Sequence, residues 1–283
     1  MQNLQTLISQ IEKGREIHIS ILDLNGILDT PLTKISFKNV IHSKAFCDMA
    51  KSTPKGYGRC IECKNKANKK AKTEKAPFCG HCSYGLYELA YPVIQSGNVV
   101  AIIYVGNAVI DEQISKSIIE RASKKTGVDK NLLFSELNNA EKIESEKELY
   151  EIAEIVSDYM KMLCDIAPKN KNNIHWLVSL IKEHIDENYS EDLSLKEIAN
   201  TYQKNEKYLG RLFKEQMGIS FSSYYNSVRL KKAEGLLQNS SLKVLDIALE
   251  CGFNNVSYFN RLFYKKHSIS PKEYRKANDR IIK

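Results

Sequence analysis

The stretch Tyr208-Leu-Gly-Arg-Leu-Phe213 recurs fifty residues later (208 to 258) as Tyr258-Phe-Asn-Arg-Leu-Phe263. Beyond the two copies, Gly218-Ile-Ser matches Ser268-Ile-Ser at the same offset. Chance is a poor explanation for matches at several positions in one register. The sequence therefore contains two copies of one structural unit near its C-terminal end.

Each copy is predicted to form a short helix, a tight turn and a longer helix, the arrangement that lets the second helix enter a DNA major groove. In the first copy, Asn205 can cap the longer helix and Gly218 offers a left-handed stop. The second copy runs over residues 244–251, turns at Gly252 and then resumes. A helix over residues 220–237 would join the copies rigidly and so fix their spacing along DNA.

From about residue 172 to its end, the chain resembles the DNA-binding domain of the AraC/XylS family. The strings that carry this resemblance are Asp246-Ile-Ala-Leu-Glu-Cys-Gly-Phe253, Ser257-Tyr-Phe-Asn-Arg-Leu-Phe263 and Ile269-Ser-Pro-Lys-Glu-Tyr-Arg275. The resemblance implies contacts to double-stranded promoter DNA from the exposed faces of the two longer helices, through Lys207, Gly210, Arg211, Ser257, Asn260 and Arg261. Arg211 and Arg261 are the best candidates for bidentate contact with guanine. For the other four, a solvated helix face or a phosphate contact is the alternative.

The composition permits this function without requiring it. A chain of 283 residues is long enough for two domains of roughly 100 to 200 residues each. The 42 Lys and Arg against 34 Asp and Glu give a formal charge of +8, which suits a polyanionic partner but is common in other proteins. The apolar stretch 99–105 is too short to cross a membrane, and no signal-peptide core is visible. We therefore expect a cytoplasmic protein with no membrane partner.

Residues 1–139 are predicted to form an α+β domain with an antiparallel sheet. Asn25-Gly26 predicts a two-residue hairpin turn after a strand over 17–24. A second hairpin is expected to join residues 86–94 with 99–109. Lysine-rich segments at 43–50 and 60–75 have helical character between these hairpins.

The same region resembles the PocR sensory domain, a PAS-like module found ahead of AraC-type domains. The resemblance covers roughly residues 5–125 and rests on Phe46-Cys47, Arg59-Cys60, Cys82, Gly85-Leu86, Pro92 and Gly106-Asn-Ala108. It implies a pocket for a small-molecule inducer, namely a small alcohol, a diol or a similar hydrocarbon derivative. Ser83 stands where His commonly follows Cys82, and Asn107 stands where Gln commonly follows the glycine.

Tyrosines at strand spacing are the candidate ligand-binding residues of this region. Core packing is the alternative for them, but a phenol beside a mostly apolar pocket can orient a small polar ligand. The residues chosen on this basis are Tyr84, Tyr91 and Tyr104, and Asn107 of the PocR-like motif is added to them.

Five of the seven cysteines lie between residues 47 and 82. Cys60-x-x-Cys63 and Cys79-x-x-Cys82 have the spacing of a tetrahedral zinc site, and Cys47 is a further candidate ligand. A structural zinc is the favoured interpretation. An iron–sulfur cluster, a redox-responsive thiol pair and packed inert thiols remain alternatives.

Residues 140–171 are interpreted as a connector, with a long helix over 141–164 and a polar linker, ahead of the DNA-binding domain at 172–283. The helix carries an apolar stripe made by Ile143, Leu149, Ile152, Val156, Tyr159 and Leu163. The stripe either covers the sensor sheet or pairs with a partner chain. A homodimer is expected, because two copies would extend the DNA site and raise avidity.

The sequence therefore predicts a ligand-responsive transcription regulator, with RNA polymerase as a further partner if it is an activator. No phosphate-binding glycine loop, GxSxG elbow or convincing nucleophile and base pair occurs, so we expect no enzyme activity. One alternative is a redox- or metal-responsive regulator that signals through the cysteines. Another is a DNA-damage sensor in which a thiolate accepts a methyl group.

Overall fold

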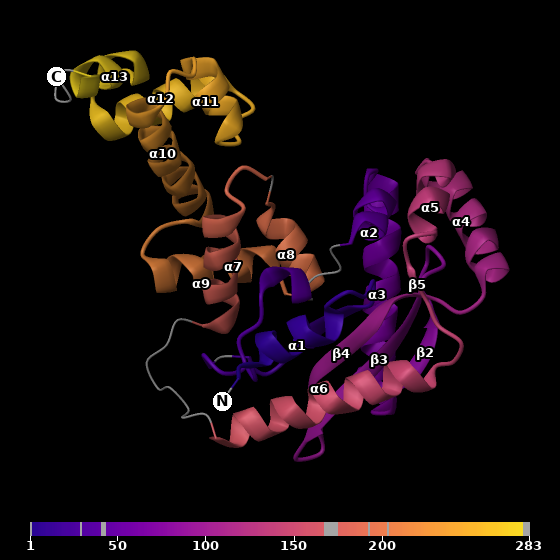
Figure 1. The fold of residues 1–283 in the computed structure, drawn as a ribbon. Helices are drawn as coiled ribbons and strands as arrows, with labels where there is room; N and C mark the ends of the chain where they lie inside the picture. Colours follow the sequence, from indigo (N-terminus) through magenta and orange to yellow (C-terminus); the bar gives the residue numbers. More distant parts are fainter. Residues whose placement is uncertain are drawn as a thin grey trace. The chain divides into compact units, whose positions relative to one another are not determined.

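The computed structural model describes residues 2–28, 30–40, 44–166, 175–191, 193–202 and 204–279 (Figure 1). The chain divides into two compact units, one comprising Met1–Trp176 and Thr201–Gln203 and the other Leu177–Asn200 and Lys204–Lys283. The first is an antiparallel sheet with helices and the second is all helical, which confirms the predicted fold class. Across the described ranges, no helix is long and apolar enough to cross a membrane.

The sheet of the first unit has the strand order β1-β4-β3-β2, and β5 adds to β4 in parallel. Its strands are β1 (His18–Asp23), β2 (Phe78–His81), β3 (Tyr87–Gln95), β4 (Asn98–Val109) and β5 (Glu141–Lys142). Ser96 and Gly97, with φ of 48° and 77°, close the β3–β4 hairpin in the two-residue turn that matches strand twist. The second predicted hairpin is therefore confirmed.

The first predicted hairpin, at Asn25-Gly26, is wrong. β1 pairs with β4, and residues 27 and 28 lie in a turn. The buried carboxylate of Asp23 accepts hydrogen bonds from the backbone N–H groups that follow it. These are 2.9 Å from Asn25, 2.7 Å from Gly26, 3.1 Å from Ile27 and 2.9 Å from Leu28. The Asp23 side chain takes up the amides that the expected partner strand would have used.

Helices cover both faces of this sheet. They are α1 (Leu4–Glu12), the 3-10 turn η1 (Phe37–Asn39), α2 (Ala45–Ala50), α3 (Pro54–Glu74), α4 (Glu112–Thr126), α5 (Lys130–Leu137) and α6 (Lys147–Ile166). In Figure 1, α6 runs across one face, and α3 packs on β3 and β4 from the other. A second cluster of buried side chains joins α2, α4 and α5 through Phe46, Ile119 and Leu133.

The long helix α6 belongs to the first unit and not to a separate connector. Its residues Leu149, Ile152, Val156 and Leu163 are buried as it packs on α1 and the sheet. These residues of the apolar stripe therefore cover the sheet and are not available to pair with a partner chain. The expected linker at 167–171 lies outside the described residues.

The second unit consists of α7 (Trp176–Glu187), α8 (Leu195–Thr201), α9 (Glu206–Met217), α10 (Phe221–Asn239), α11 (Val244–Glu250), α12 (Val256–His267) and α13 (Pro271–Asp279). Asn205 caps α9 by accepting the N–H groups of Lys207 and Tyr208, and Gly218 ends it at a φ of 74°. Ser220 caps the joining helix α10. Both helix-turn-helix units stand where the repeat predicts them.

Candidate DNA interface and sensor site

The first candidate recognition helix, α9, separates buried aromatic and apolar residues from exposed cations. Leu209 and Phe213 are fully buried, and the Phe213 ring contacts those of Phe221 and Tyr224 edge-on. Lys207 and Arg211 are exposed on the other side of the helix. Nε of Arg211 lies 3.6 Å from the Glu215 carboxylate, and both side chains are largely exposed, so this ion pair contributes little and leaves the arginine available.

The second candidate recognition helix, α12, repeats this arrangement. Phe259 and Phe263 are fully buried, whereas Ser257, Asn260 and Arg261 are exposed. The Arg261 guanidinium lies 5.3 Å from the centroid of the Tyr258 ring, whose hydroxyl accepts a hydrogen bond from Asn226. The structure therefore places Arg261 at the position in α12 that Arg211 occupies in α9.

Gly210 differs from the other predicted DNA contacts because it is partly buried. A Cβ at this position would lie 3.3 Å from Cδ2 of Leu195 in α8, closer than most real Cβ contacts. Gly210 thus lets α8 and α9, the two helices of the first helix-turn-helix, approach each other. This packing role requires no contact with DNA.

Arg229 of α10 joins the two helix-turn-helix units. Its buried guanidinium donates to the carbonyl oxygens of Tyr189 (2.6 Å) and Glu191 (2.9 Å) and lies 5.7 Å from the centroid of the Phe253 ring. Gly252 has a φ of +81° and packs so closely that a Cβ there would lie 2.6 Å from the Ser190 carbonyl oxygen. The loop after α7 is therefore fixed against the turn between α11 and α12 in the second helix-turn-helix. This contact holds α9 and α12 at one spacing.

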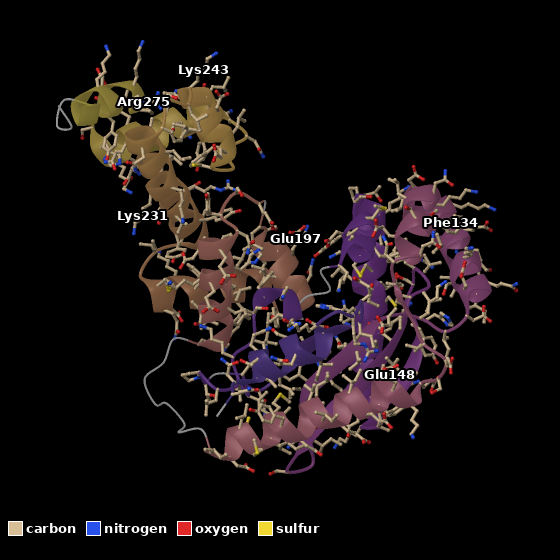
Figure 2. The ribbon with its side chains drawn as sticks, viewed as in Figure 1. Phe134, Glu148, Glu197, Lys231, Lys243 and Arg275 are labelled. Carbon is tan, nitrogen blue, oxygen red and sulfur yellow. The ribbon has the colours of Figure 1, made fainter. Side chains whose placement is uncertain are left out.

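Several cations near the C-terminal end of the DNA-binding unit have structural partners; Figure 2 labels one of these cations, Arg275. Arg275 donates to the carbonyl oxygen of Leu242 at 2.6 Å. Lys266 and His267 contact the Glu234 carboxylate at 2.7 and 2.8 Å. Burial acts to raise the pKa of Glu234, but these two partners lower it overall. Lys266 is therefore a weaker candidate for a phosphate contact than the exposed Lys214 and Lys265.

The four candidate ligand-binding residues of the first unit do not share one site. Tyr104 faces α3, where its hydroxyl donates to Oδ1 of Asn68, whereas Tyr91 pairs with Ile103 on the opposite face. Tyr84 is buried in the cluster of α2, α4 and α5, and Asn107 donates to the Glu16 carbonyl oxygen at 2.7 Å. The expectation of a single pocket lined by all four is wrong, because successive strand residues point to opposite faces.

The second CxxC motif is divided between the two faces of the sheet, because Cys79 lies apart from the other four cysteines of this region. Cys79 lies beside Glu146, which precedes α6, and beside Tyr150 of α6. Burial raises the pKa of Cys79 to about 12. Cys47, Cys60, Cys63 and Cys82 lie on the other side, where burial raises the pKa of each thiol and the nearby carboxylate of Glu88 of β3 adds to the rise.

This arrangement does not fit a four-thiolate zinc site that includes Cys79. Within the described ranges, no group of three or more His, Cys, Asp or Glu residues is placed to hold a metal ion. The spacing misled because Cys79 is a residue of β2 and Cys82 follows this strand, so that Cys79 is turned away from Cys82.

Comparison with known families agrees with both halves of the structure. Residues 1–167 match the family described as the sensory domain found in PocR, and residues 189–277 match a helix-turn-helix domain. The chain is an AraC-family transcription regulator with a PocR sensory domain.

Relatives of the regulator cover either its DNA-binding part or most of its length. The uncharacterized regulator YijO of Escherichia coli is 39% identical over 100 residues, 35% of each chain. The regulatory protein PocR of Salmonella typhimurium is 23% identical over 252 residues, 81% of each chain. The C-terminal domain of AraT, a response regulator from Geobacillus stearothermophilus, is 30% identical and covers 38% of this chain and 88% of its own, with a TM-score of 0.36. Proteins of this family are DNA-binding regulators and not enzymes.

Three polar residues at the centre of the regulator's first unit were missed in the sequence. Lys64 and Asn68 lie one turn apart on the sheet-facing side of α3, and Glu88 faces them from β3. In the sequence, Lys64 and Asn68 cannot be told apart from the other residues of a lysine-rich stretch. Finding them requires the pairing of Ala90 with Tyr104, a structural feature that fixes which residues of β3 and β4 face α3.

Proposed function

We propose that this regulator binds its promoter by placing α9 and α12 in two successive segments of the major groove. The observation that carries the proposal is the equivalent exposed placement of Arg211 and Arg261 on two helices whose spacing is fixed through Arg229. Lys207, Ser257 and Asn260 share the same exposed faces. If the regulator is an activator, RNA polymerase is a further partner.

The test is to select binding sites from a pool of random duplexes with the full chain, and then measure affinity for the selected site. Arg211→Ala and Arg261→Ala should each weaken binding and relax preference at one position, because a bidentate arginine reads one base. Arg121→Ala, which removes an exposed arginine of the first unit, is the matched control. Equal effects of all three substitutions would count against the assignment of the two helices.

The first unit is proposed to sense a small alcohol, a diol or a related hydrocarbon derivative. Its match to the PocR sensory family over residues 1–167 supports this ligand class. Thermal shift with short alcohols, diols and aldehydes tests it on the full chain. Stabilisation by one of these classes is the expected result, and no shift with any of them would contradict the proposal.

We further propose that the regulator forms a homodimer through the outer side of α6. Ile155, Met162 and Ile166 are large apolar side chains that remain exposed there, although α6 buries its opposite side. With Tyr159 they follow the 4-3-4 spacing of a coiled-coil seam, which suits pairing with an identical helix. Sedimentation of the wild-type chain and of Met162→Lys should give a dimer and a monomer respectively.

A redox- or metal-responsive regulator is the second candidate, favoured by the grouping of Cys47, Cys60, Cys63 and Cys82 around Glu88. Zinc binding by the cysteines of residues 47–82 stays a prediction, and an iron–sulfur cluster or a methyl-accepting thiolate is a weaker one. Elemental analysis of anaerobically purified protein tests the metal. Mass measurement after incubation with methylated DNA tests methyl transfer.

A further inference from the structure

The exposed arginine of α12 has a support that its counterpart in α9 lacks. In α12, the guanidinium of Arg261 lies over the Tyr258 ring, 5.3 Å from its centroid and one turn away on the same helix. A guanidinium at this distance is attracted to the face of the ring. In α9, Tyr208 and Arg211 hold the equivalent positions, but Nε of Arg211 lies 3.6 Å from the Glu215 carboxylate. The two arginines are therefore oriented by different groups.

Tyr258 is itself fixed through its backbone, its ring and its hydroxyl, although the residue is 37% exposed. Its backbone N–H donates to Oδ1 of Asn255, the cap of α12, at 2.9 Å. The centroid of its ring lies 6.5 Å from that of the buried Phe253 ring. Its hydroxyl accepts a hydrogen bond of 3.0 Å from Nδ2 of Asn226. The Tyr258 ring is thus a fixed support for the Arg261 guanidinium.

Asn226 connects this support to α10, the helix that joins the two helix-turn-helix units. It is partly buried and lies 32 residues before Tyr258 in the sequence. Arg229, less than one turn further along α10, binds the carbonyl oxygens of the loop after α7. Within the described ranges, no such hydrogen bond holds the hydroxyl of Tyr208 in α9. Asn226 therefore ties the exposed side of α12, and not that of α9, to a helix that is anchored elsewhere.

An arginine that is already held in one orientation loses less freedom when it meets DNA. Ordering a free side chain with many rotamers weakens binding by about twofold to tenfold. A bidentate contact with guanine is sensitive to orientation, because its two parallel hydrogen bonds form together. The base preference that Arg261 supplies should therefore depend on the group that holds its guanidinium.

We propose that Asn226 and Tyr258 are positioning residues that set how selectively Arg261 reads its base. Asn226 acts through the Tyr258 hydroxyl and makes no base contact of its own. The inference rests on the proposed function, in which Arg261 reads one position of the promoter. It goes beyond that function by assigning part of the sequence preference to a residue of α10, outside both candidate recognition helices.

A double-mutant cycle on the full chain tests this role. Arg261→Ala first identifies the position of the selected duplex that Arg261 reads, and affinity is then compared between duplexes that differ only there. Asn226→Ala and Tyr258→Phe should each lower the preference at that position by about twofold to tenfold, because each breaks the same hydrogen bond. Neither substitution should lower it further in the Arg261→Ala chain.

Two variants serve as matched controls for the cycle. Tyr208→Phe removes the equivalent hydroxyl of α9. Asn239→Ala removes an exposed asparagine of α10 whose Nδ2 donates to the Gly235 carbonyl oxygen at 2.9 Å. Both should leave the preference at the position read by Arg261 unchanged. Tyr258→Phe keeps the ring and its packing, so the cycle remains decisive even where Asn226→Ala fails to fold.

The ratio of affinities separates positioning from a structural or phosphate-binding role. A packing defect or a lost phosphate contact weakens binding to all duplexes by one factor and leaves the ratio unchanged, and this result would overturn the proposal. An effect of Tyr258→Phe on the ratio that persists in the Arg261→Ala chain would also overturn it, while base reading by Arg261 stands. If Arg261→Ala relaxes the preference at no position, the proposed function of α12 fails and the positioning role fails with it.

Discussion

Helices α3 and α9 use their polar sides in opposite ways. α9 buries Leu209 and Phe213 and turns Lys207 and Arg211 outward, as an amphipathic surface helix does. α3 turns Lys64 and Asn68 toward the sheet. An outward polar side is solvated by water and free to meet a macromolecule, whereas an inward one must be satisfied by protein groups or by a small ligand.

Arg229 shows how an inward polar group is satisfied without a ligand. Its guanidinium donates to two carbonyl oxygens and to the Tyr225 hydroxyl, and it lies over the Tyr225 ring. Asn68, by contrast, leaves one donor unmet among the described residues. The difference indicates that Arg229 serves the architecture of the DNA-binding unit.

Arg229→Ala should have the largest effect. It removes a buried cation and leaves the carbonyl oxygens of Tyr189 and Glu191 without their donor, so the free energy of unfolding of the DNA-binding unit should fall by roughly 3 kcal/mol. Urea denaturation followed by circular dichroism measures this. A loss below about 0.5 kcal/mol would show that Arg229 does not hold the two helix-turn-helix units together.

Arg261→Ala should weaken binding to the selected duplex by about 1 to 3 kcal/mol, with no comparable loss of stability, because Arg261 is exposed and reads a base. Fluorescence anisotropy titration measures the affinity. If Arg261→Ala weakens binding to all sequences equally, Arg261 contacts phosphate, and the exposed side of α12 positions the protein on DNA without reading a base at this residue.

Low pH should destabilise the second unit through His184. Burial lowers the pKa of His184 to about 4, whereas an unfolded histidine titrates near pH 6.5. The unfolded chain therefore binds the proton more readily, and the stability contributed by neutral His184 is present above about pH 6.5 and is lost as the pH falls toward 4. At pH 5.5 the loss should be about 1 kcal/mol relative to pH 7.5. Urea unfolding of His184→Leu at both values is the comparison, and an equal loss in this variant would refute the assignment.

Asn68→Leu should have the smallest effect on stability. The substitution removes the unpartnered Nδ2 along with the acceptor of the Tyr104 hydroxyl, so gain and loss nearly cancel, and the change should stay below about 1 kcal/mol without ligand. Thermal unfolding of the ligand-free chain measures it. A loss as large as that of Arg229→Ala would mean that Asn68 is a structural residue.

The sequence predicted the DNA-binding unit well because its information is local and repeated. Caps such as Asn205 and Ser220, the stop at Gly218 and the inward aromatic residues all act within a few residues of one another. These signals define the helices and their exposed sides before any tertiary contact is known. Arg229 escaped this reasoning because its partners lie about forty residues away in the sequence.

The sensor unit was harder to predict because its site depends on strand register. Tyr91 and Tyr104 are separated in the sequence like residues of one hairpin, yet the pairing of Tyr91 with Ile103 puts them on opposite faces. Cys79 is turned from Cys82 in the same way, and Asp23 replaced a hairpin by capturing four amides. None of these outcomes follows from residue type or spacing alone.

The most direct test of the account is the affinity of the full chain for its selected duplex, measured in the wild type, in Arg211→Ala and Arg261→Ala, and in the control Arg121→Ala. The account predicts that each substitution in α9 or α12 weakens binding and relaxes the base preference at one position, whereas Arg121→Ala binds as the wild type does. Equal affinity of all four proteins would contradict the claim that the outward sides of α9 and α12 read the promoter.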